Sequence, residues 1–255
     1  MAKFVRKKGK VLALIPARLN SKRLPKKVLL SIANLPLIIH VYRRVLFSKK
    51  IDDAYICCDD KAIFDCAKKF GAKVILTSKK HNNGSERILE GYKKIKKKYR
   101  LIVDVQGDEP LINPRHIDKV IDFHLKNSDA DIVVPNLLIE NIPNKNIVKI
   151  VSNKMNKIIY FSRSQVPFGL EKKEKKLKKH LSIVSFSPNA LKRYSAQKPT
   201  ENEKIEKIEL MRALDLGMNI KTFTLKGDSF SVDVKNDFIQ AKKYMIKDKF
   251  YNFYK

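Results

Sequence analysis

The sequence predicts an α/β protein with a mainly parallel central sheet, and two observations support this prediction. Short apolar runs of strand length alternate with longer segments whose apolar residues follow the helical period. This alternation favours parallel strands joined by right-handed helical crossovers. The second observation is Leu101–Val105, an apolar run that ends at the flexible Gly107 and leaves Asp108 at the carboxyl end of a buried strand. Ligands of open α/β sheets bind beyond such ends, so we expect the functional site there.

The first half of the chain alternates regularly between the two element types. Strands are expected where apolar and β-branched residues run together, and helices where apolar residues recur every three or four positions. The predicted elements are, in order, a strand at Val11–Ile15, a helix at Pro36–Phe47, a strand at Ala54–Cys58, a helix at Lys61–Phe70 closed by Gly71, a strand at Lys73–Leu76, a helix capped by Ser85, the strand at Leu101–Val105, a helix at Arg115–Leu125 and a strand at Ile132–Val134.

The pattern changes after residue 135. Two apolar runs with asparagines between them predict a hairpin, and the basic segment Glu171–Lys179 predicts an exposed loop. The elements predicted in this half are a hairpin of Ile147–Val151 and Lys157–Phe161 turning at Asn153 and Asn156, a strand at Leu181–Phe186, an amphipathic helix at Glu203–Leu216 closed by Gly217, a strand at Ile220–Leu225 and a helix at Lys235–Ile246. We therefore expect residues 136–200 to form a smaller antiparallel subdomain within a core of residues 1–135 and 201–255.

The charge of the chain is strongly positive, with 55 basic and 26 acidic residues giving a net charge of +29. Such a charge can indicate a nucleic-acid partner. The lysines are spread along the whole chain, however, in runs such as Lys93–Lys98 and Lys172–Lys179 without interleaved aromatic residues or a recognisable nucleic-acid motif. We interpret them as solvated faces that help to attract anionic substrates, and we expect no nucleic-acid partner.

The apolar runs and the cysteines bear on location. No apolar run approaches the roughly 20 residues that span a bilayer, so we expect no membrane insertion. Three cysteines are present, and Cys57 and Cys58 are neighbours, an arrangement poorly suited to a disulfide framework. A reducing cytoplasm fits this usage best. No second Cys/His cluster completes a tetrahedral metal site beside these two cysteines, so we assign them a structural role.

The loop after the first predicted strand, Pro16–Lys27, is strongly cationic. Its basic residues are Arg18, Lys22, Arg23, Lys26 and Lys27. A triphosphate requires such a loop because several negative charges must be neutralised at once. The alternative is a solvated basic loop. The loop is not a Walker A sequence, since the required Gly and Lys-Ser/Thr pattern is missing.

Acidic residues occur at two element boundaries. Asp108 is placed to hold a metal ion against a substrate phosphate, although it and Glu109 could instead cap the helix expected near Pro114. Asp233 lies just before the last predicted helix. A cation also lies at a boundary: Arg87 falls in the first turn of its helix, where the helix dipole disfavours an unpaired cation, so a bound anion or a specific partner is expected.

Several separated stretches together resemble one family, the bacterial and plant 3-deoxy-manno-octulosonate cytidylyltransferases, also called CMP-Kdo synthetases. The family opens with Ile-Pro-Ala-Arg followed by Ser-x-Arg-Leu-Pro-Gly-Lys, and it contains His-x-Ser-Gly-Thr-Glu-Arg and Val-Gln-Gly-Asp-Glu-Pro. The matching stretches here are Ile15–Arg18, Ser21–Lys27, His81–Arg87, Val105–Pro110, Tyr160–Arg163, His180–Leu181, Glu206–Arg212 and Val232–Asp233. The resemblance covers nearly the whole chain, and the joint occurrence of these motifs is much more specific than any one of them.

The resemblance implies a Rossmann-like nucleotidyltransferase fold. In it, residues 1–135 and 201–255 would form the nucleotide-binding core, and residues 136–200 the sugar-binding and dimerisation subdomain of a homodimer. The implied reaction is attack of the anomeric hydroxyl of a 2-keto-3-deoxy sugar acid on the α-phosphate of CTP, giving a CMP-sugar for lipopolysaccharide synthesis and releasing pyrophosphate. The implied cofactor is magnesium (Mg2+).

The residues that match the family motifs take their expected roles from this resemblance. Asp108 and Asp233 would hold magnesium and act in catalysis together with Lys27 and Arg18. The expected CTP-binding positions are Ala17, through its backbone, and Arg18, Lys27 and Arg87. The expected sugar-acid pocket consists of Gln106, Arg163, His180 and Glu209, with the arginine paired to the sugar carboxylate.

The chain departs from the family pattern at several positions. Lys26 replaces a glycine, Val184 replaces a tyrosine, Leu210 replaces a glutamine, and the segment from Arg163 to His180 is shorter than in the family. The departures other than Lys26 fall near the expected sugar pocket and leave the exact acid open. Alternatives to Kdo are an amino-substituted Kdo and a nonulosonate. A much weaker alternative is a basic nucleic-acid-binding protein that keeps the fold without catalysis.

Overall fold

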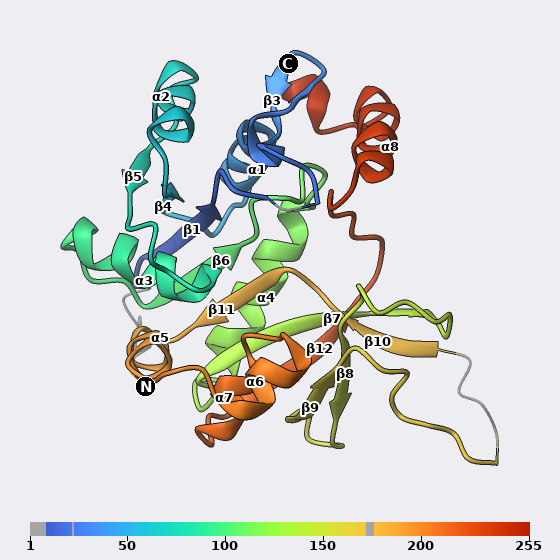
Figure 1. Cartoon of the computed structure of the whole chain (residues 1–255). Helices are drawn as coiled ribbons and strands as arrows, with labels where there is room; N and C mark the ends of the chain where they lie inside the picture. The colour runs from blue at the N-terminus through green and yellow to red at the C-terminus, as the bar shows by residue number, and fades with distance from the viewer. Residues whose placement is uncertain (1–8, 22, 172–175) are drawn as a thin grey trace, which may run out of the picture.

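The computed structural model describes residues 9–21, 23–171 and 176–255 (Figure 1). It is organised around a ten-stranded mixed sheet with the strand order β5-β4-β1-β6-β11-β7-β10-β8-β9, in which β12 also pairs with β7. The α/β class with a Rossmann-like parallel region is confirmed. None of the helices in these described ranges has the length and apolar character needed to cross a membrane.

The parallel half of the sheet follows the predicted alternation closely. Its elements are β1 (Val11–Ala17), α1 (Leu37–Leu46), β4 (Asp53–Cys58), α2 (Lys61–Lys69), β5 (Val74–Leu76), α3 (Gly84–Ile95), β6 (Leu101–Val105) and α4 (Pro114–Lys126). Strands β4, β1 and β6 pair in parallel. Between β1 and α1 lie η1 (Lys27–Leu29) and a small two-stranded sheet of β2 (Ser31–Ile32) and β3 (Leu35–Pro36).

Strands β1, β4 and β6 each contribute to two cores, because successive side chains point to opposite faces. In β1, Ala13 and Ile15 pack into the core that includes α1, α2 and α4, whereas Leu12 and Leu14 pack into the core that includes α3 and α5 (Pro188–Ser195). The last helix, α8 (Lys235–Ile246), contributes Ala241 and Met245 to the first core. The sheet is therefore covered on both sides, which leaves its strand ends for the site.

The antiparallel strands continue the same sheet. They are β7 (Ile132–Glu140), β8 (Lys149–Ser152), β9 (Ile158–Ser162), β10 (Lys176–His180) and β11 (Ile183–Phe186), with β12 (Ile220–Leu225) parallel to β7. The predicted hairpin of β8 and β9 is confirmed. Strand β11 lies between β6 and β7, so it joins the antiparallel region to the parallel one. The division into a core and a sugar-binding subdomain stays a prediction.

The prediction of an exposed basic loop up to Lys179 is wrong for residues 176–179, and residues 172–175 lie outside the described part. Strand β10 pairs antiparallel with β7, residue Lys176 opposite Glu140 and His180 opposite Asn136. Leu177 is buried while Lys176 stays exposed. Pairing with a neighbouring strand therefore overrides the low strand propensity of a lysine run.

The predicted single helix Glu203–Leu216 is also wrong, because the chain forms two short helices, α6 (Glu201–Glu206) and α7 (Met211–Asp215). Between them Lys207 adopts a left-handed conformation with φ 56°. The guanidinium of Arg163 donates hydrogen bonds to the carbonyl oxygens of Glu206 and Lys207, at 2.9 and 3.0 Å. These contacts satisfy carbonyls that a continuous helix would have used, and they leave Glu209 in the break.

Two helix starts differ from the prediction. Helix α3 is capped by Asn83, whose side chain accepts a hydrogen bond of 2.9 Å from the backbone N–H of Glu86, and not by Ser85. The unpredicted helix α5 begins after Ser187, whose side chain caps Ala190, with Pro188 in its first turn. Serine followed by proline is a recognisable start signal, and the helix was missed because it is only 8 residues long.

Candidate active site

The site lies at the carboxyl edge of the parallel strands, where β1 and β6 end side by side. A Cβ atom on Gly107 would lie 2.6 Å from the carbonyl oxygen of Pro16, so only glycine lets these two strand ends approach so closely. After Gly107 the backbone carbonyl of Asp108 accepts a 2.9 Å hydrogen bond from Val232 N–H. This bond brings the segment before α8 to the end of β6.

Three residues that the sequence places far apart meet at this edge. The Lys27 ammonium lies 2.8 Å from Asp108 Oδ2 and 3.2 Å from Asp233 Oδ1. Arg23 reaches the same oxygen of Asp233 at 2.8 Å. Lys27 is buried, while both carboxylates are partly exposed. The two carboxylates therefore face one small space and remain open to solvent on one side.

The alternative that Asp108 and Glu109 cap the following helix is wrong. Asn113 caps α4, because its side chain accepts a 3.0 Å hydrogen bond from Arg115 N–H. Glu109 is instead buried, and burial raises its pKa to about 7. Asp108 is thus free of a capping role.

The two aspartates suit magnesium. Their oxygens already converge on one cationic group, the Lys27 ammonium, and magnesium prefers one or two carboxylates together with substrate phosphates and water. Within the described ranges no group of three or more His, Cys, Asp or Glu side chains could hold an ion by itself. An ion held by these two carboxylates would complete its coordination with oxygens of water or of a substrate.

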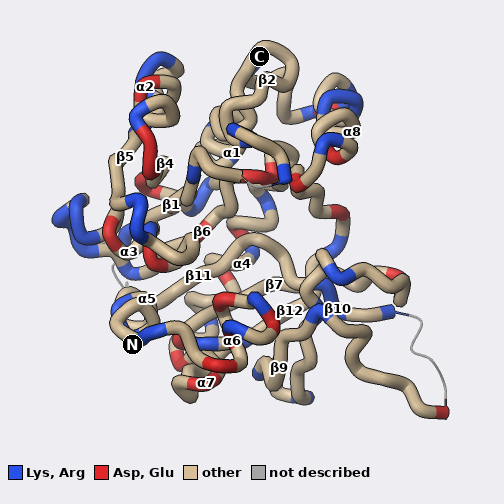
Figure 2. Tube along the Cα trace, in the orientation of Figure 1, with Lys and Arg blue, Asp and Glu red and all other residues tan. Residues whose placement is uncertain are grey.

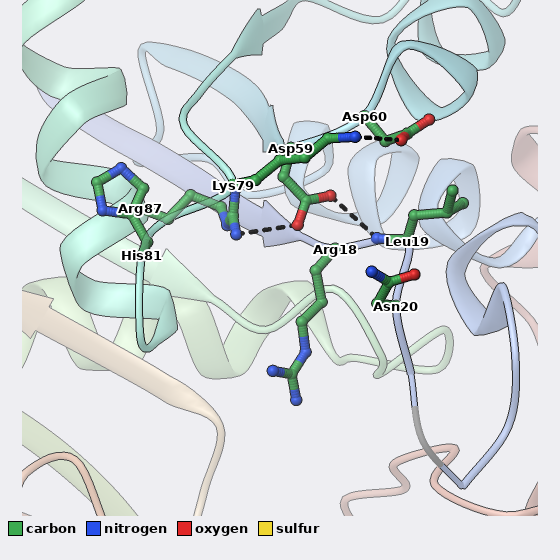
Figure 3. Close-up of a pocket in the computed structure, with 8 residues that line it drawn as sticks. All are labelled: Arg18, Leu19, Asn20, Asp59, Asp60, Lys79, His81 and Arg87. Carbon is green, nitrogen blue, oxygen red and sulfur yellow. Dashed lines mark hydrogen bonds and ion pairs between the residues drawn. The ribbon is translucent and has the colours of Figure 1, made fainter.

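A hollow beside the end of β1 is lined by Arg18, Leu19, Asn20, Asp59, Asp60, Lys79, His81 and Arg87 (Figure 3). Arg18 is exposed and its side chain points away from Asp59, whereas Ala17 is buried at the end of β1. Arg87 has the specific partner that its position required: its guanidinium pairs with Asp59 at 3.1 Å. The structure thus brings Ala17, Arg18 and Arg87 to one region. The Arg87 side chain points toward Asp59, whereas the Arg18 side chain points away from it.

Gln106 and Glu209, two of the expected sugar-pocket residues, lie in a buried acidic environment. The amide nitrogen of Gln106 donates a 2.9 Å hydrogen bond to Asp104, and Ser85 N–H donates to Glu209 at 3.4 Å. Burial raises the pKa of Glu209 to about 7. Burial and the nearby Glu209 raise the pKa of Asp104 well above its usual range.

Asp104 was missed by the reasoning from sequence. Its side chain is fully buried and its Oδ1 has no hydrogen-bond partner among the described residues. The available signal was a single acidic residue between Val103 and Val105 in an otherwise apolar strand. A carboxyl group in such a strand is expensive to bury and calls for an explanation.

His180 and Arg163 lie in the antiparallel region, where His180 ends β10 and Arg163 follows β9. Burial lowers the pKa of His180 to about 4, with smaller contributions from Lys179 and Arg163, so its imidazole is neutral near pH 7. Arg163 donates to the carbonyls of Lys145, Glu206 and Lys207 at 2.9 to 3.0 Å. The expected pairing of Arg163 with a sugar carboxylate stays a prediction.

The substituted positions Val184 and Leu210 are buried in the core beside α3 and α5. Val184 lies opposite Asp104 in the pairing of β11 with β6. Apolar packing thus compensates for the loss of polar residues at these two positions. The side chains near Asp104 and Glu209 are correspondingly more apolar.

Solved structures with the same fold are nucleotidyltransferases. A CMP:2-keto-3-deoxy-manno-octonic acid synthetase solved in complex with CTP superposes with a TM-score of 0.88 at 29% identity, over 93% of this chain and 99% of that one. A cytidylyltransferase from Leptospira borgpetersenii shares the fold, with a TM-score of 0.65 at 19% identity over 94% and 88% of the two chains. With two converging carboxylates at its carboxyl edge, the chain is a nucleotidyltransferase.

Sequence relatives identify the family. The model of the cytidylyltransferase family matches residues 12–220. A 3-deoxy-manno-octulosonate cytidylyltransferase from Thermodesulfovibrio yellowstonii is 38% identical over 91% of this chain and 96% of its own, and one from Rickettsia typhi is 38% identical over 93% and 98%. The maize protein of that name is 35% identical over 90% and 79%. The chain belongs to the 3-deoxy-manno-octulosonate cytidylyltransferase family.

Proposed function

We propose that the chain transfers CMP from CTP to 3-deoxy-D-manno-octulosonate (Kdo) with the help of Mg2+, forming CMP-Kdo for lipopolysaccharide synthesis. The observation that carries this proposal is the convergence of Asp108 and Asp233 on Lys27 at the carboxyl edge. The anomeric hydroxyl of the sugar would attack the α-phosphorus of CTP, the bond to the β-phosphate would break, and pyrophosphate would leave. The high identity to named relatives supports the choice of nucleotide and sugar.

The residues of the site take distinct roles in this proposal. Asp108 and Asp233 hold Mg2+, which supplies positive charge to the phosphate oxygens in the transition state. Lys27, released from the two carboxylates, offsets charge on the phosphates, and the exposed Arg18 does the same from the loop after β1. Ala17 offers its backbone to the nucleotide, while Gln106, His180, Glu209 and Arg163 orient the sugar acid.

Two substituted positions bear on the identity of the sugar acid. Val184 and Leu210 remove polar groups expected near the pocket. An amino-substituted Kdo or a nonulosonate is therefore the second candidate. A nucleic-acid-binding role is disfavoured because Lys27, Asp108 and Asp233 remain assembled, an arrangement that a binding protein does not require.

Asp108→Asn tests the proposed chemistry through pyrophosphate release from CTP, Mg2+ and Kdo. We expect a decrease of about 100-fold or more, because a neutral amide holds a divalent ion much less strongly than a carboxylate does. Asp122→Asn is the matched control, since Asp122 is a half-exposed aspartate of α4 that pairs with Lys50. Chelation of the metal should also abolish release. Pyrophosphate release with another sugar acid but not with Kdo would show that the other acid is the substrate. Salt-sensitive DNA binding without any pyrophosphate release would contradict the proposal of an enzyme.

We also propose that two copies of the chain form a homodimer through the antiparallel region. Large apolar side chains are exposed there: Leu138, Ile142, Ile159, Phe168 and Leu170. Phe168 and Leu170 are 81% and 87% exposed, which is unusual for apolar residues that face only water. A second copy covering this patch is the occupant that the family resemblance suggests.

A cytoplasmic location completes the proposal. All three cysteines are free thiols in the structure, and Cys57 and Cys58 are buried. Unpaired buried thiols are typical of a reducing compartment.

A further inference from the structure

Asp59 joins two segments that line the hollow in Figure 3, and the proposed reaction needs both segments. It follows the last residue of β4, and its side chain is only 13% exposed. Its Oδ1 accepts a 3.0 Å hydrogen bond from Leu19 N–H, and its Oδ2 pairs with the Arg87 guanidinium at 3.1 Å. One carboxylate therefore connects the loop after β1 to the start of α3.

Arg87 directs its terminal nitrogens into the protein. Besides Asp59, it donates to Thr77 Oγ1 at 2.8 Å and to the carbonyl of Ser78 at 3.1 Å. Thr77 in turn donates to the carbonyl of Cys58 at 2.9 Å. The Arg87 side chain is 5% exposed. Both terminal nitrogens are thus engaged, and little of the group is accessible to a phosphate.

Leu19 immediately follows Arg18, so its N–H belongs to the peptide group that the two residues share. Holding this N–H fixes the orientation of that peptide plane and the direction in which the Arg18 side chain leaves the chain. Arg18 is exposed and points away from Asp59 (Figure 3). The bond from Leu19 to Asp59 therefore sets where the exposed Arg18 is presented.

We propose that Asp59 is a positioning residue for CTP, which holds the Arg18 loop in its binding conformation, and that Arg87 acts through Asp59 and does not contact the nucleotide. This inference rests on the proposed use of CTP. Arg87 neutralises a carboxylate that would otherwise repel a triphosphate at the same hollow. It also fixes the rotamer in which Asp59 reaches Leu19.

A double-mutant cycle of Asp59→Ala and Arg87→Ala separates these two roles of Arg87. The measurements are the Kd of CTP with Mg2+ by calorimetry, and kcat and both KM values from pyrophosphate release. We expect Asp59→Ala to weaken CTP binding about tenfold and to leave the KM of the sugar acid within about twofold. Arg87→Ala should weaken CTP binding further, because it leaves the Asp59 charge unpaired. The double variant should match Asp59→Ala alone.

Direct contact between Arg87 and the triphosphate predicts a different result. The double variant would then bind CTP more weakly than either single variant, by roughly the product of the two effects, and this would overturn the proposal. An unchanged Kd in Asp59→Ala would overturn it as well. Wild-type protein that binds CTP without turning over Kdo contradicts only the proposed sugar, since the Kd comparison still decides the role of Asp59. Wild-type protein that does not bind CTP contradicts both proposals.

Two further variants guard against a merely structural effect. Asp59→Asn keeps an oxygen for Leu19 N–H but loses the charge that pairs with Arg87, so its Kd for CTP should lie between those of wild type and Asp59→Ala. Asp65→Ala removes an exposed carboxylate of α2 that pairs with Lys61 and should leave CTP binding unchanged. Equal loss in Asp59→Asn and Asp59→Ala, with melting temperatures lowered alike, would indicate a fold defect and reject the positioning role.

Discussion

Lys26 adopts a left-handed backbone conformation, with φ 52° and ψ 27°, directly before the Lys27 that reaches the carboxylates. The resembling family has glycine at this position, and glycine adopts such a conformation without steric conflict. A residue with a Cβ atom is less stable there by about 1–2 kcal/mol. The tight turn is needed to bring Lys27 to Asp108 and Asp233, so the strain is tolerated at the site.

We predict that Lys26→Gly stabilises the protein by about 0.5–1 kcal/mol, since relief of the strain exceeds the added flexibility of the unfolded chain. This corresponds to a melting temperature higher by roughly 1–4 °C. Activity should be retained because Lys27 keeps its position. Lys96→Gly is a matched control away from the site, because Lys96 ends α3 with φ 54° and should gain similarly. A lower melting temperature in Lys26→Gly alone would show that the lysine side chain, not the backbone, decides stability at this turn.

The fully buried Asp104 and the half-buried Glu209 predict a pH-dependent stability. Burial raises the pKa of Glu209 to about 7 and also raises that of Asp104. Between the ordinary pKa of Glu209, 4.5, and its raised value, the folded state binds more protons than the unfolded state. Stability must therefore fall as the pH rises from about 5 through 7. Glu209→Gln should abolish this contribution. The melting temperature of the variant should therefore rise relative to that of wild type as the pH increases from 5 to 8.

The measurement is thermal unfolding of both proteins across this pH range. Asp122→Asn, at a half-exposed position, should keep a constant offset from wild type over the same range. Asp104→Asn should follow Glu209→Gln in direction, because it removes the second buried acid. If the difference in melting temperature between Glu209→Gln and wild type does not change with pH, Glu209 is ionised in the folded protein throughout this pH range.

At the scale of elements, the C-terminal turn η2 (Tyr251–Phe253) and Tyr254 close over α1. The Tyr254 hydroxyl accepts a 3.2 Å hydrogen bond from Nε of Arg44 and contacts His40 Nδ1 at 3.1 Å. Arg44 is almost fully buried and also pairs with Asp248. The Tyr251 hydroxyl donates to the carbonyl of Ala33 at 2.7 Å. The end of the chain thus satisfies a buried charge on a helix of the core.

We predict that removal of residues 250–255 destabilises the protein by about 3 kcal/mol, because it opens a buried arginine and removes its aromatic cover. Tyr254→Phe should lose only about 1 kcal/mol, since it removes the hydroxyl and keeps the ring. Chemical unfolding of the three proteins gives both values. Equal stability of the truncated and full-length chains would show that Asp248 and the carbonyl of Ile112 suffice for Arg44.

At the scale of the whole molecule, charge and apolar surface are distributed differently. Figure 2 shows Lys and Arg over α2, α3, α8 and β10, on several sides of the chain, without a single continuous stripe. This distribution agrees with solvated faces and with general attraction of anionic substrates. Among the described residues of the antiparallel region, by contrast, the large apolar side chains with the highest exposure are Phe168 and Leu170.

We predict that the wild-type chain is a dimer in solution and that the double variant Phe168→Ser, Leu170→Ser is a monomer, as measured by sedimentation velocity. The reason is that a homodimer interface depends on a few large apolar side chains that leave water on association. Phe253→Ser is the matched control, because Phe253 is 73% exposed but lies in the C-terminal turn. A variant that stays dimeric would place the interface elsewhere, and a monomeric wild type would contradict the proposed homodimer.

Local sequence patterns were enough to predict the alternation of strands and helices from Val11 to Lys126 and the carboxyl edge at Gly107, because hydrophobic period and glycine placement are local properties. Separate motifs of the sequence also predicted that Lys27, Asp108 and Asp233 belong to one active site.

Other features depend on contacts between distant segments, which override the local preference of the chain. Lys176–His180 became a strand because β7 pairs with it, and Glu203–Leu216 broke in two because Arg163 binds the carbonyls of Glu206 and Lys207. Arg87 turned toward Asp59, and Asp104 was buried beside Glu209, for the same physical reason: a partner far along the chain is invisible to period and propensity until the fold brings it within a few ångströms.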